Sequence, residues 1–259
     1  MIDPLRLAVR QVRFENKAFW RNPASAFFTF AFPLMFLFVF TTLLGNDTIT
    51  LPRGGEVKAS TYYTASILAF AVITACYTNI AMSVTFLRDE GVLKRVRGTP
   101  LRPWSYLLGR IFHAVLVMVL LVVIVCAFGR VAYDISLPTT SAPAFLVTLL
   151  VGAFAFCALG LAATVVVPNA DAAPAVVNGT VLPLLFLSGV FIPIDDGPAW
   201  IRTFAGVFPV RPFLEAIVDS FLPRAGDAGW RPGSLALVAA WGIGGLVVAN
   251  RWFRWEARR

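Results

Sequence analysis

Few residues in this chain have the types and spacings that catalysis would require. His113 is the only histidine, and a lone histidine near a membrane interface is usually a hydrogen-bonded packing residue rather than a proton relay. Asp195 and Asp196 stand side by side in the sequence, and we expect them on the outer side of the membrane, away from His113. A lipid-acting enzyme built from these three groups is therefore disfavoured.

The chain also lacks the sequence motifs of hydrolases. None of its lysines, which are Lys17, Lys58 and Lys94, belongs to a Gly-x-x-x-x-Gly-Lys-Ser/Thr loop, so we expect no nucleotide hydrolysis by this chain itself. No His-Glu-x-x-His or Gly-x-Ser-x-Gly pattern occurs. The three cysteines all fall in apolar segments, where we interpret them as small core residues rather than metal ligands or disulfide partners. The sequence thus predicts a non-enzymatic chain without a metal or cofactor of its own.

The elements that position these residues are apolar segments of membrane-spanning length. Hydrophobic residues make up 58% of the 259 residues and charged residues only 14%, against about 25% charged in a soluble domain. Six uncharged windows are each long enough to cross a hydrocarbon core of about 30 Å. The spans predicted within them are residues 23–45, 60–87, 107–129, 142–167, 173–193 and 233–252. We therefore predict an all-α integral membrane protein in which residues 1–259 form a single transmembrane domain.

The charges between the spans predict the orientation in the membrane. With the N-terminus in the cytoplasm, the inner segments hold 15 of the 22 basic residues and six acidic ones, a net charge of +9. The outer segments then carry a net charge of −1. Because cytoplasmic loops are enriched in Lys and Arg, both termini are predicted to be cytoplasmic. This sorting explains the net charge of +8 without a nucleic acid partner, and the strong excess of Arg over Lys favours a bacterial plasma membrane.

The middle of every predicted span is free of acidic and basic residues. Ion-coupled carriers and proton pumps keep such residues there despite a cost of about 2.5–3.5 kcal/mol each, so ion coupling is disfavoured. The alternatives that stay open are a passive pore, a membrane scaffold and the membrane half of a transporter powered by another subunit.

Residues 1–22, before the first span, are predicted to form an amphipathic helix along the cytoplasmic interface. Its basic residues recur every three or four positions and therefore share one side of the helix. They are Arg6, Arg10, Arg13, Lys17 and Arg21. The apolar opposite side suits the headgroup boundary of an anionic bilayer, and a solvated cytoplasmic arm is the alternative. The Asn-Pro pair at positions 22–23 is expected to end this helix and turn the chain into the membrane.

The densest charge cluster follows the second span, in the loop of residues 88–103. Val92, Leu93 and Val96 form one apolar edge of a short helix that ends at Gly98. A short amphipathic cytoplasmic helix can dock into a groove on a partner protein. An ordinary positive-inside loop would explain the basic residues, but it explains less well the acidic pair, the glycine and the apolar edge.

Residues 194–217 are predicted to form a re-entrant element on the outer side. Proline breaks this segment too often for it to cross the bilayer, and it is too apolar for a solvated loop, since Trp200, Phe208 and Phe213 would all be exposed. Short helices that enter the outer leaflet and return satisfy both conditions. Irregular backbone at that depth must be buried in protein or line a cavity, so we expect this element at the outer end of a pathway.

The order of these parts resembles the permease subunits of type-2 ABC exporters, the class that contains the daunorubicin-resistance and polysaccharide-export permeases. The resemblance spans nearly the whole chain, and its specific parts are residues 88–101 and 187–212. The first reads Arg-Asp-Glu-Gly-x-Leu-Lys-Arg-x-Arg-x-Thr-Pro-Leu, and a Phe-Leu-Ser-Gly-Val-Phe-Ile-Pro stretch leads into the second. The resemblance implies two permeases, either two copies or two related chains, and two ATPase subunits that bind ATP and Mg²⁺.

The resemblance also implies roles for individual residues. The loop after the second span would be a coupling helix seated in a cleft of the ATPase subunit, and the N-terminal helix would touch the same subunit. The residues implied in this contact are Arg10, Arg13, Arg88, Asp89, Glu90, Gly91, Leu93, Lys94, Arg95 and Thr99. Those implied in an outer gate are Phe191, Pro193, Trp200 and Pro209. A substrate path is expected along Phe32, Phe36, Tyr77 and Phe186.

The function expected from this resemblance is export of an amphipathic drug or a lipid-like molecule, with energy supplied by a separate ATPase subunit. The short outer loops and the missing carbohydrate-binding addition favour such cargo over a polysaccharide or a glycolipid, which is the alternative within the family. A passive channel or a membrane scaffold is the alternative outside it.

Overall fold

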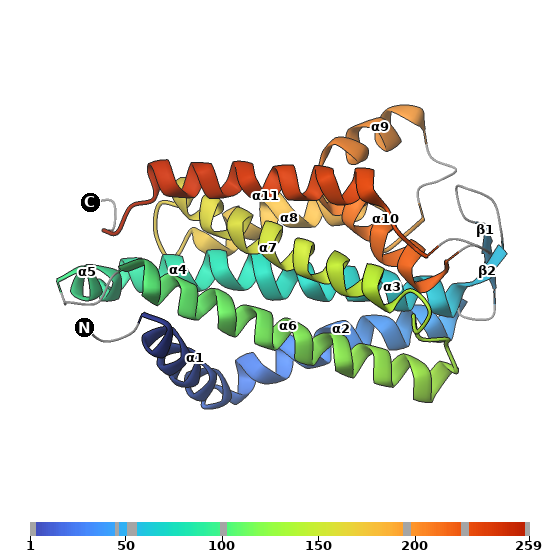
Figure 1. The fold of residues 1–259 in the computed structure, drawn as a ribbon, viewed down its shortest axis with the longest axis horizontal. Coiled ribbons are helices and arrows are strands. Elements are labelled where there is room, and N and C mark those ends of the chain that lie inside the picture. Colours follow the sequence, from blue (N-terminus) through green and yellow to red (C-terminus); the bar gives the residue numbers. More distant parts are fainter. Residues whose placement is uncertain are drawn as a thin grey trace.

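The computed structural model describes residues 4–44, 47–50, 56–98, 103–193, 198–223 and 228–256. It is an elongated helical bundle with both ends of the described chain at one end and a small hairpin at the other (Figure 1). The helices are α1 Pro4–Trp20, α2 Pro23–Leu44, α3 Ala59–Ile73, the π-helix η1 Thr74–Thr78, α4 Asn79–Asp89, α5 Val92–Arg97, α6 Pro103–Tyr133, α7 Ala142–Val166, α8 Ala173–Leu187, α9 Ala199–Val207, α10 Val210–Phe221 and α11 Pro232–Trp252. The strands β1 Thr48–Thr50 and β2 Glu56–Lys58 pair antiparallel. The predicted all-α membrane class is confirmed.

Five helical segments in the described part of the chain are long and apolar enough to cross a membrane. They lie in α2, in the continuous run α3–η1–α4, and in α6, α7 and α11. The sixth apolar helix, α8, has 15 residues and ends at Leu187, earlier than the expected span of 173–193. Its end is followed by Gly189, whose φ of +88° takes the backbone off the helical path.

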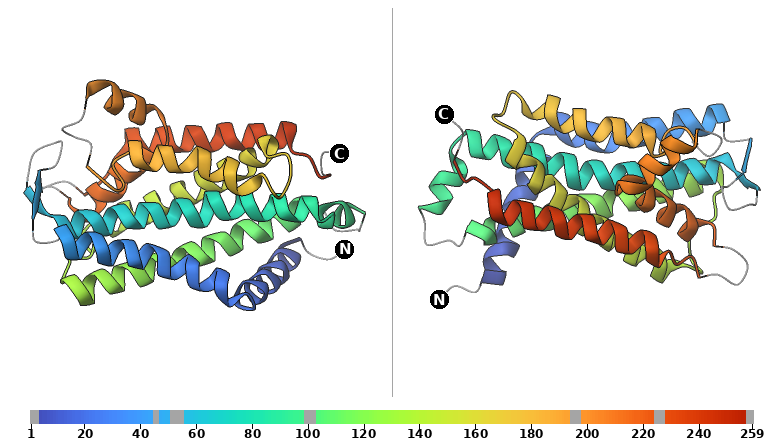
Figure 2. Two further views of the ribbon diagram at one scale, coloured as in Figure 1. Left: turned by 180° about the vertical axis from the view of Figure 1, so that it is seen from behind. Right: turned by 90° about the horizontal axis from the view of Figure 1, so that it is seen from above.

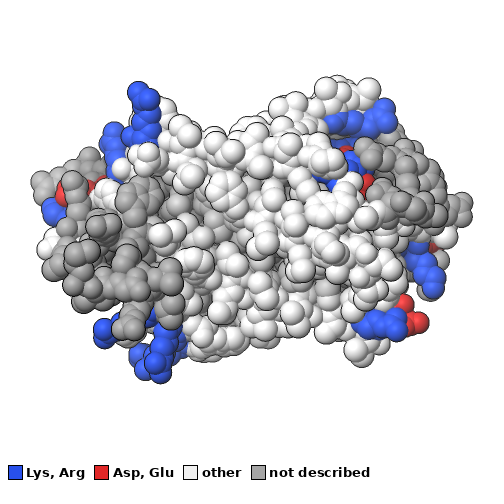
Figure 3. All heavy atoms as spheres, viewed as in Figure 1, with Lys and Arg blue, Asp and Glu red and all other residues white. Residues whose placement is uncertain are grey.

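The run α3–η1–α4 and helix α7 form the centre of the bundle. Every residue of α3 is buried, and the left view of Figure 2 shows the run between α8 on one side and α2 and α6 on the other. The peripheral helices α2 and α11 instead expose large apolar side chains such as Phe27, Phe28 and Val247. Charged side chains gather at the two ends of the face drawn in Figure 3 and leave an uncharged band between them. Such a band is stable where lipid tails replace water, as around a membrane span.

Small residues let the central helices approach closely. A Cβ added at Gly242 of α11 would lie 2.8 Å from the Cα of Ala155 in α7. A Cβ at Gly160 of α7 would lie 2.8 Å from the carbonyl oxygen of Tyr77 in η1. Close backbone contact of this kind is the usual basis of helix association in lipid, so α7 is fixed between α11 and the π-helix.

The N-terminal helix α1 packs on α6, which the sequence did not predict. The ring of Phe19 meets His113 edge to face at 5.7 Å, and Glu15 forms an ion pair with Arg110 at 3.2 Å. Part of the apolar side of α1, which we expected to face the headgroup boundary, is therefore covered by protein. Between α1 and α2 the helix breaks at residues 21–22, and Pro23 begins α2.

The end of the bundle opposite the two termini carries two short helices (Figure 1). Helix α9 projects from the bundle, whereas α10 is largely buried against α3, α7 and α11 (Figure 1). Ion pairs hold α10 to the start of α11, since Arg231 contacts Glu215 at 2.7 Å and also contacts Asp219. Within α10, Arg211 contacts the same Glu215 at 3.0 Å. Residues 194–197 of the predicted re-entrant element lie outside the described residues.

Candidate functional site

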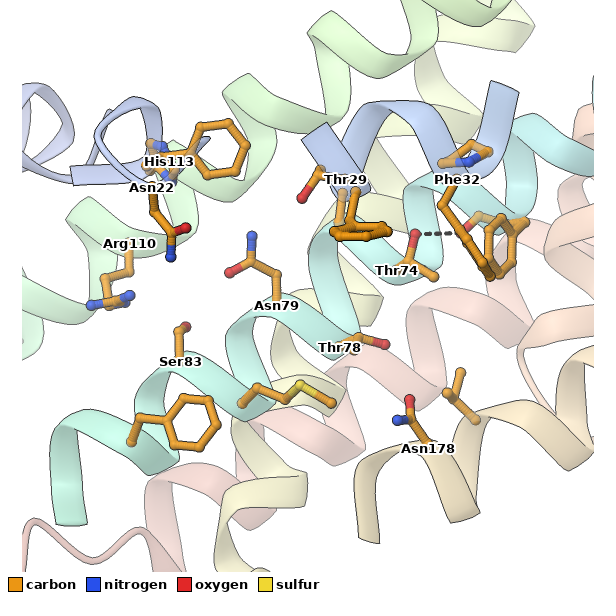
Figure 4. Close-up of a pocket in the computed structure, with 18 of the residues that line it drawn as sticks. Asn22, Thr29, Phe32, Thr74, Thr78, Asn79, Ser83, Arg110, His113 and Asn178 are labelled. Carbon is orange, nitrogen blue, oxygen red and sulfur yellow. Dashed lines mark hydrogen bonds between the residues drawn. The ribbon is translucent and has the colours of Figure 1, made fainter. Parts of the chain in front are cut away.

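A cavity of about 770 Å³ opens into the bundle between α1, α2, the η1–α4 segment, α6 and α8. Its apolar wall includes Phe28, Phe32 and Phe86, and its lining extends up to Phe70 of α3. Figure 4 shows the labelled side chains gathering around one space from these helices. The cavity reaches from the level of α1 deep into the apolar part of the bundle.

The polar lining of the cavity is mostly neutral. Thr74 and Thr78 come from η1, Asn79 and Ser83 from α4, and Asn178 from α8. Among the described residues no hydrogen bond engages the side-chain amides of Asn79 and Asn178, whereas the Thr74 hydroxyl donates to the Phe70 carbonyl at 3.0 Å. Polar groups at membrane depth are expensive unless they are paired or line a hydrated cavity. The two amides are thus placed to form hydrogen bonds with a ligand in the cavity.

Charged groups in the lining lie at the end of the cavity nearest α1. Arg110 and Glu15 form their ion pair there, and Figure 4 shows Asn22, Arg110 and His113 close together at this end. His113 is buried, and its Nε2 has no hydrogen-bond partner among the described residues. Because Arg110 and Glu15 carry opposite charges, this pair adds no net charge to the lining.

An aromatic cluster adjoins the cavity and shares Phe32 and Phe70 with its wall. We use this name for Phe32, Phe36, Phe40, Phe70, Phe186 and Phe191, whose rings touch one another. Phe191 is buried at the centre of the cluster, and its ring centroid lies 5.4 Å from that of Phe36 and 4.9 Å from that of Phe186. The structure therefore brings together one residue implied in the gate with three of those expected along the path. Tyr77, the fourth, belongs to the π-helix, and its hydroxyl lies 2.7 Å from that of Thr180 in α8.

The other residues implied in the outer gate lie in α9, at the start of α10 and in the segment after α8. Trp200 is exposed on α9, Pro209 is buried at the start of α10, and Pro193 is half-buried after α8. The Trp241 indole donates to the carbonyl of Val207, the last residue of α9, at 2.8 Å.

The charged loop after the second span forms the predicted short helix, α5. Gly91 lies between α4 and α5 with a φ of +71°, and a Cβ added there would meet nothing within 4 Å. Glycine is therefore needed at this position for backbone conformation rather than for room. Glu90, Lys94 and Arg95 are exposed, whereas Leu93 is fully buried against the bundle. The apolar edge of α5 is thus partly used to attach the helix to its own chain. Thr99 lies outside the described residues.

Arg88 and Asp89 are engaged within the chain. The Arg88 guanidinium is buried and donates to the carbonyl oxygens of Thr164 and Val167 at 2.7 and 2.6 Å. Asp89 accepts a hydrogen bond from the backbone nitrogen of Ala170. Arg10 and Arg13, the residues of α1 implied in the partner contact, are both exposed.

Sequence reasoning missed the neutral polar lining of the cavity. The sequence prediction of functional residues within the spans depended on charged residues, and Asn79 and Asn178 each lie inside an uncharged window. The signal that could have identified them is the amide itself, because a buried primary amide in lipid needs hydrogen-bond partners. The π-helix at residues 74–78 had no signal in the sequence, although such turns frequently mark functional sites.

The ABC-2 type transporter family matches residues 10–222, which is most of the chain. The chain is 24% identical over 160 residues to the probable multidrug ABC transporter permease YbhR of Escherichia coli K12, and equally to that of strain O157:H7. The aligned stretch covers 62% of this chain but only 43% of those relatives, so the chain spans less than half of their length. The chain belongs to the ABC-2 type transporter family.

Proposed function

We propose that the chain is the permease of an ATP-driven exporter that moves small amphipathic molecules out of the cytoplasm, with the cavity as its substrate site. The cavity is the observation that carries this proposal. Its volume of about 770 Å³ falls within the ~300–1,000 Å³ typical of small-molecule sites. Cargo of drug or lipid-like size fits this volume.

The lining of the cavity supports an amphipathic cargo. Phe28, Phe32 and Phe86 offer aromatic surface to an apolar body, and Asn79 and Asn178 offer hydrogen bonds to a polar group. Since the Glu15–Arg110 pair is internally neutral, the site does not demand a charged cargo. The YbhR relatives carry a multidrug description, which agrees with a site of this broad chemistry.

The energy for transport comes, in this proposal, from a separate ATPase subunit that binds ATP and Mg²⁺. The family supports an ATP-binding partner, and α5 offers exposed Glu90, Lys94 and Arg95 for its docking. Two permeases, identical or related, would enclose the path with two ATPase subunits in a bacterial plasma membrane. The end of the bundle that carries α5 would face the cytoplasm.

The route of the cargo follows from the order of the parts. Cargo would bind in the cavity, pass the aromatic cluster around Phe191 and leave beside α9 and α10. Phe32 and Phe70 belong both to the cavity wall and to the cluster, so in this proposal the cluster is the barrier on the outer side of the cavity. Opening the path requires these rings to separate.

Purification from the native membrane tests this proposal. The tagged full-length chain should bring with it a nucleotide-binding subunit in equal amount. In liposomes the complex should hydrolyse ATP faster in the presence of the amphipathic dye rhodamine 6G and should concentrate the dye on the outer side. If the chain alone carried the dye down its gradient without ATP and without a second subunit, a passive channel would replace the proposal.

A further inference from the structure

The end of α4 is tied to the turn between α7 and α8 by two consecutive charged side chains. Arg88 is 3% exposed and donates to the carbonyl oxygens of Thr164 at 2.7 Å and of Val167 at 2.6 Å. The carboxylate of Asp89 accepts a hydrogen bond from the backbone nitrogen of Ala170 at 3.2 Å. We call these three contacts the α4–α7 latch.

The chemistry at the end of α7 explains why an arginine is buried there. The last carbonyl groups of a helix have no partner within it, and they form the negative end of the helix dipole. The Arg88 guanidinium supplies a positive charge and two correctly spaced donors to this end. Losing it would leave buried carbonyl groups unsatisfied, which is far more costly than losing an exposed contact.

A small apolar cluster below the latch attaches α8 to the same place. Ala81 of α4, Val167 of the turn, and Ala173 and Val177 of α8 are fully buried against one another. Val177 immediately precedes Asn178, which lines the cavity. The end of α4, the α7–α8 turn and the first turns of α8 therefore form one packed unit at the base of the cavity.

Helix α5 is firmly joined to this unit. Only Glu90 and Gly91 separate α5 from α4, and Leu93 is buried against the bundle. A helix rises about 1.5 Å per residue, so the part of α8 that lines the cavity, up to Leu185, lies within about 18 Å of Ala173. A displacement of α5 thus has a short, continuous route to the cavity wall.

We propose that Arg88 and Asp89 are positioning residues that transmit a movement of α5 to α8 and hence to the substrate cavity. This inference rests on the proposed function, because the ATPase subunit at α5 supplies the movement. The exposed charges of α5, Lys94 and Arg95, face that subunit, whereas Arg88 acts inside the permease. The α7–α8 turn is thereby a part of the coupling device.

A role confined to capping α7 would give different results. A cap stabilises the helix and so sets the amount of folded protein. It does not set how much cargo moves for each ATP hydrolysed, nor how precisely α5 is held relative to α8. These two quantities separate the proposal from a cap.

The first arm measures the geometry in the purified full-length chain. Spin labels are placed at Lys94→Cys on α5 and Ala175→Cys on α8, both exposed positions, after the native cysteines are replaced by alanine. Electron–electron resonance should give one narrow distance distribution in this background. Arg88→Met should broaden it, and Arg254→Met, which removes an exposed arginine of the same cytoplasmic end, should leave it narrow.

The second arm measures coupling in the reconstituted complex with its ATPase subunit. Arg88→Met should lower the rhodamine 6G transported per ATP about ten-fold, the change that ~1.4 kcal/mol produces in an equilibrium. Asp89→Ala removes only the exposed contact to Ala170, so a smaller loss of about three-fold is expected. Because Asp89 is exposed, its variant tests the latch even where Arg88→Met fails to fold.

Unchanged distance distributions in Arg88→Met and Asp89→Ala, or unchanged transport per ATP in both, would overturn the latch. Absence of an ATPase subunit from the purified wild-type complex would instead overturn the proposed function. The two failures are distinguishable, since the distance measurement needs no partner subunit. A broadened distribution in Arg88→Met together with normal transport per ATP would show that the latch holds the turn but does not transmit movement, which also overturns the inference.

Discussion

The guanidinium of Arg110 lies 3.2 Å from the carboxylate of Glu15 and joins the N-terminal helix to α6. Their side chains are only 15% and 12% exposed, and Gln11 also donates to the Glu15 carboxylate at 2.8 Å. Helix α1 is therefore attached to the bundle by a specific polar contact at the end of the cavity nearest α1. An interfacial helix held only by lipid would need no such contact.

Replacing Glu15 should weaken the packing of α1 against α6. Glu15→Ala leaves Arg110 in a largely buried site without its partner, which we expect to cost about 1–3 kcal/mol. Amide hydrogen exchange of α1 should then accelerate at least several-fold while α7 and α11 exchange as before. The matched control is Glu256→Ala, because its pair with Lys94 at 3.8 Å is exposed and such pairs contribute little. Equal exchange of α1 in the two variants would contradict a structural role for the ion pair.

The conformation of Gly91, between α4 and α5, predicts an order of effects on ATP hydrolysis for three substitutions at this position. Its φ of +71° is unfavourable for alanine by about 1–2 kcal/mol, is tolerated by asparagine, and is impossible for proline. Proline would also remove the hydrogen bond from the Gly91 nitrogen to the Arg88 carbonyl. Dye-stimulated ATP hydrolysis should therefore be lost in Gly91→Pro, reduced in Gly91→Ala and nearly normal in Gly91→Asn. All three variants should still insert into the membrane.

If that order were reversed, the backbone conformation of Gly91 between α4 and α5 would not be what coupling to ATP hydrolysis requires. Glu90→Arg tests its charge separately, since Glu90 is exposed next to the glycine. We expect this variant to insert normally and to lose dye-stimulated hydrolysis, because an arginine reverses the charge offered to the ATPase subunit. Normal stimulation in Glu90→Arg would mean that this side chain does not face the partner.

The free amides of the cavity should set its affinity for cargo. Asn79→Leu or Asn178→Leu keeps the size of the side chain and removes its hydrogen bonds, so rhodamine 6G should be needed at about ten-fold higher concentration for half-maximal stimulation, as expected for the loss of ~1–1.5 kcal/mol. Asn250→Leu is the matched control, because Asn250 is exposed on α11 away from the cavity. A shift in the control equal to that in the cavity variants would remove the cavity as the binding site.

The spans could be predicted from the sequence because a membrane helix satisfies its own backbone and shows this in a local run of apolar residues. The break before Pro23 and the helix that ends at Gly98 are local in the same way. The end of α8 at Leu187 was harder, because the residues after it stay apolar and only Gly189 marks the change. Hydropathy therefore predicted six apolar segments correctly but extended the fifth beyond its helix.

The cavity and the latch could not be predicted, because both depend on which helices are neighbours. Arg88 finds its partners 76 and 79 residues further along, and these are backbone carbonyls, which have no side-chain signature. Its place in a basic cytoplasmic loop indicated an exposed contact instead. Glu15 and Arg110 are likewise 95 residues apart, so only the packing of α1 on α6 reveals the pair.

Close packing of α7 against α11 predicts opposite effects at two nearby glycines. A Cβ at Gly242 would lie 2.8 Å from the Ala155 Cα, whereas a Cβ at Gly244 would meet nothing within 4 Å. Overpacking costs about 1–3 kcal/mol, which exceeds the ~1 kcal/mol that alanine gains over glycine in a helix. Gly242→Ala should lower the thermal stability of the detergent-purified protein, and Gly244→Ala should leave it unchanged or raise it. The same loss in both variants would mean that helix flexibility, not the α7–α11 contact, requires these glycines.

The attachment of α9 to α11 depends on one indole group. The Trp241 nitrogen donates to the carbonyl of Val207 at the end of α9, and its ring stacks on Phe208 at 5.7 Å. Trp241→Phe keeps a ring for the stacking but removes the hydrogen bond, so amide exchange in α9 should accelerate about five-fold, as expected for ~1 kcal/mol. Trp230→Phe, at an exposed position before α11, is the control and should not change α9. If α9 belongs to the outer gate, as proposed, Trp241→Phe should also let rhodamine 6G leak without ATP. Unchanged exchange and leak would show that α9 is held by its other contacts.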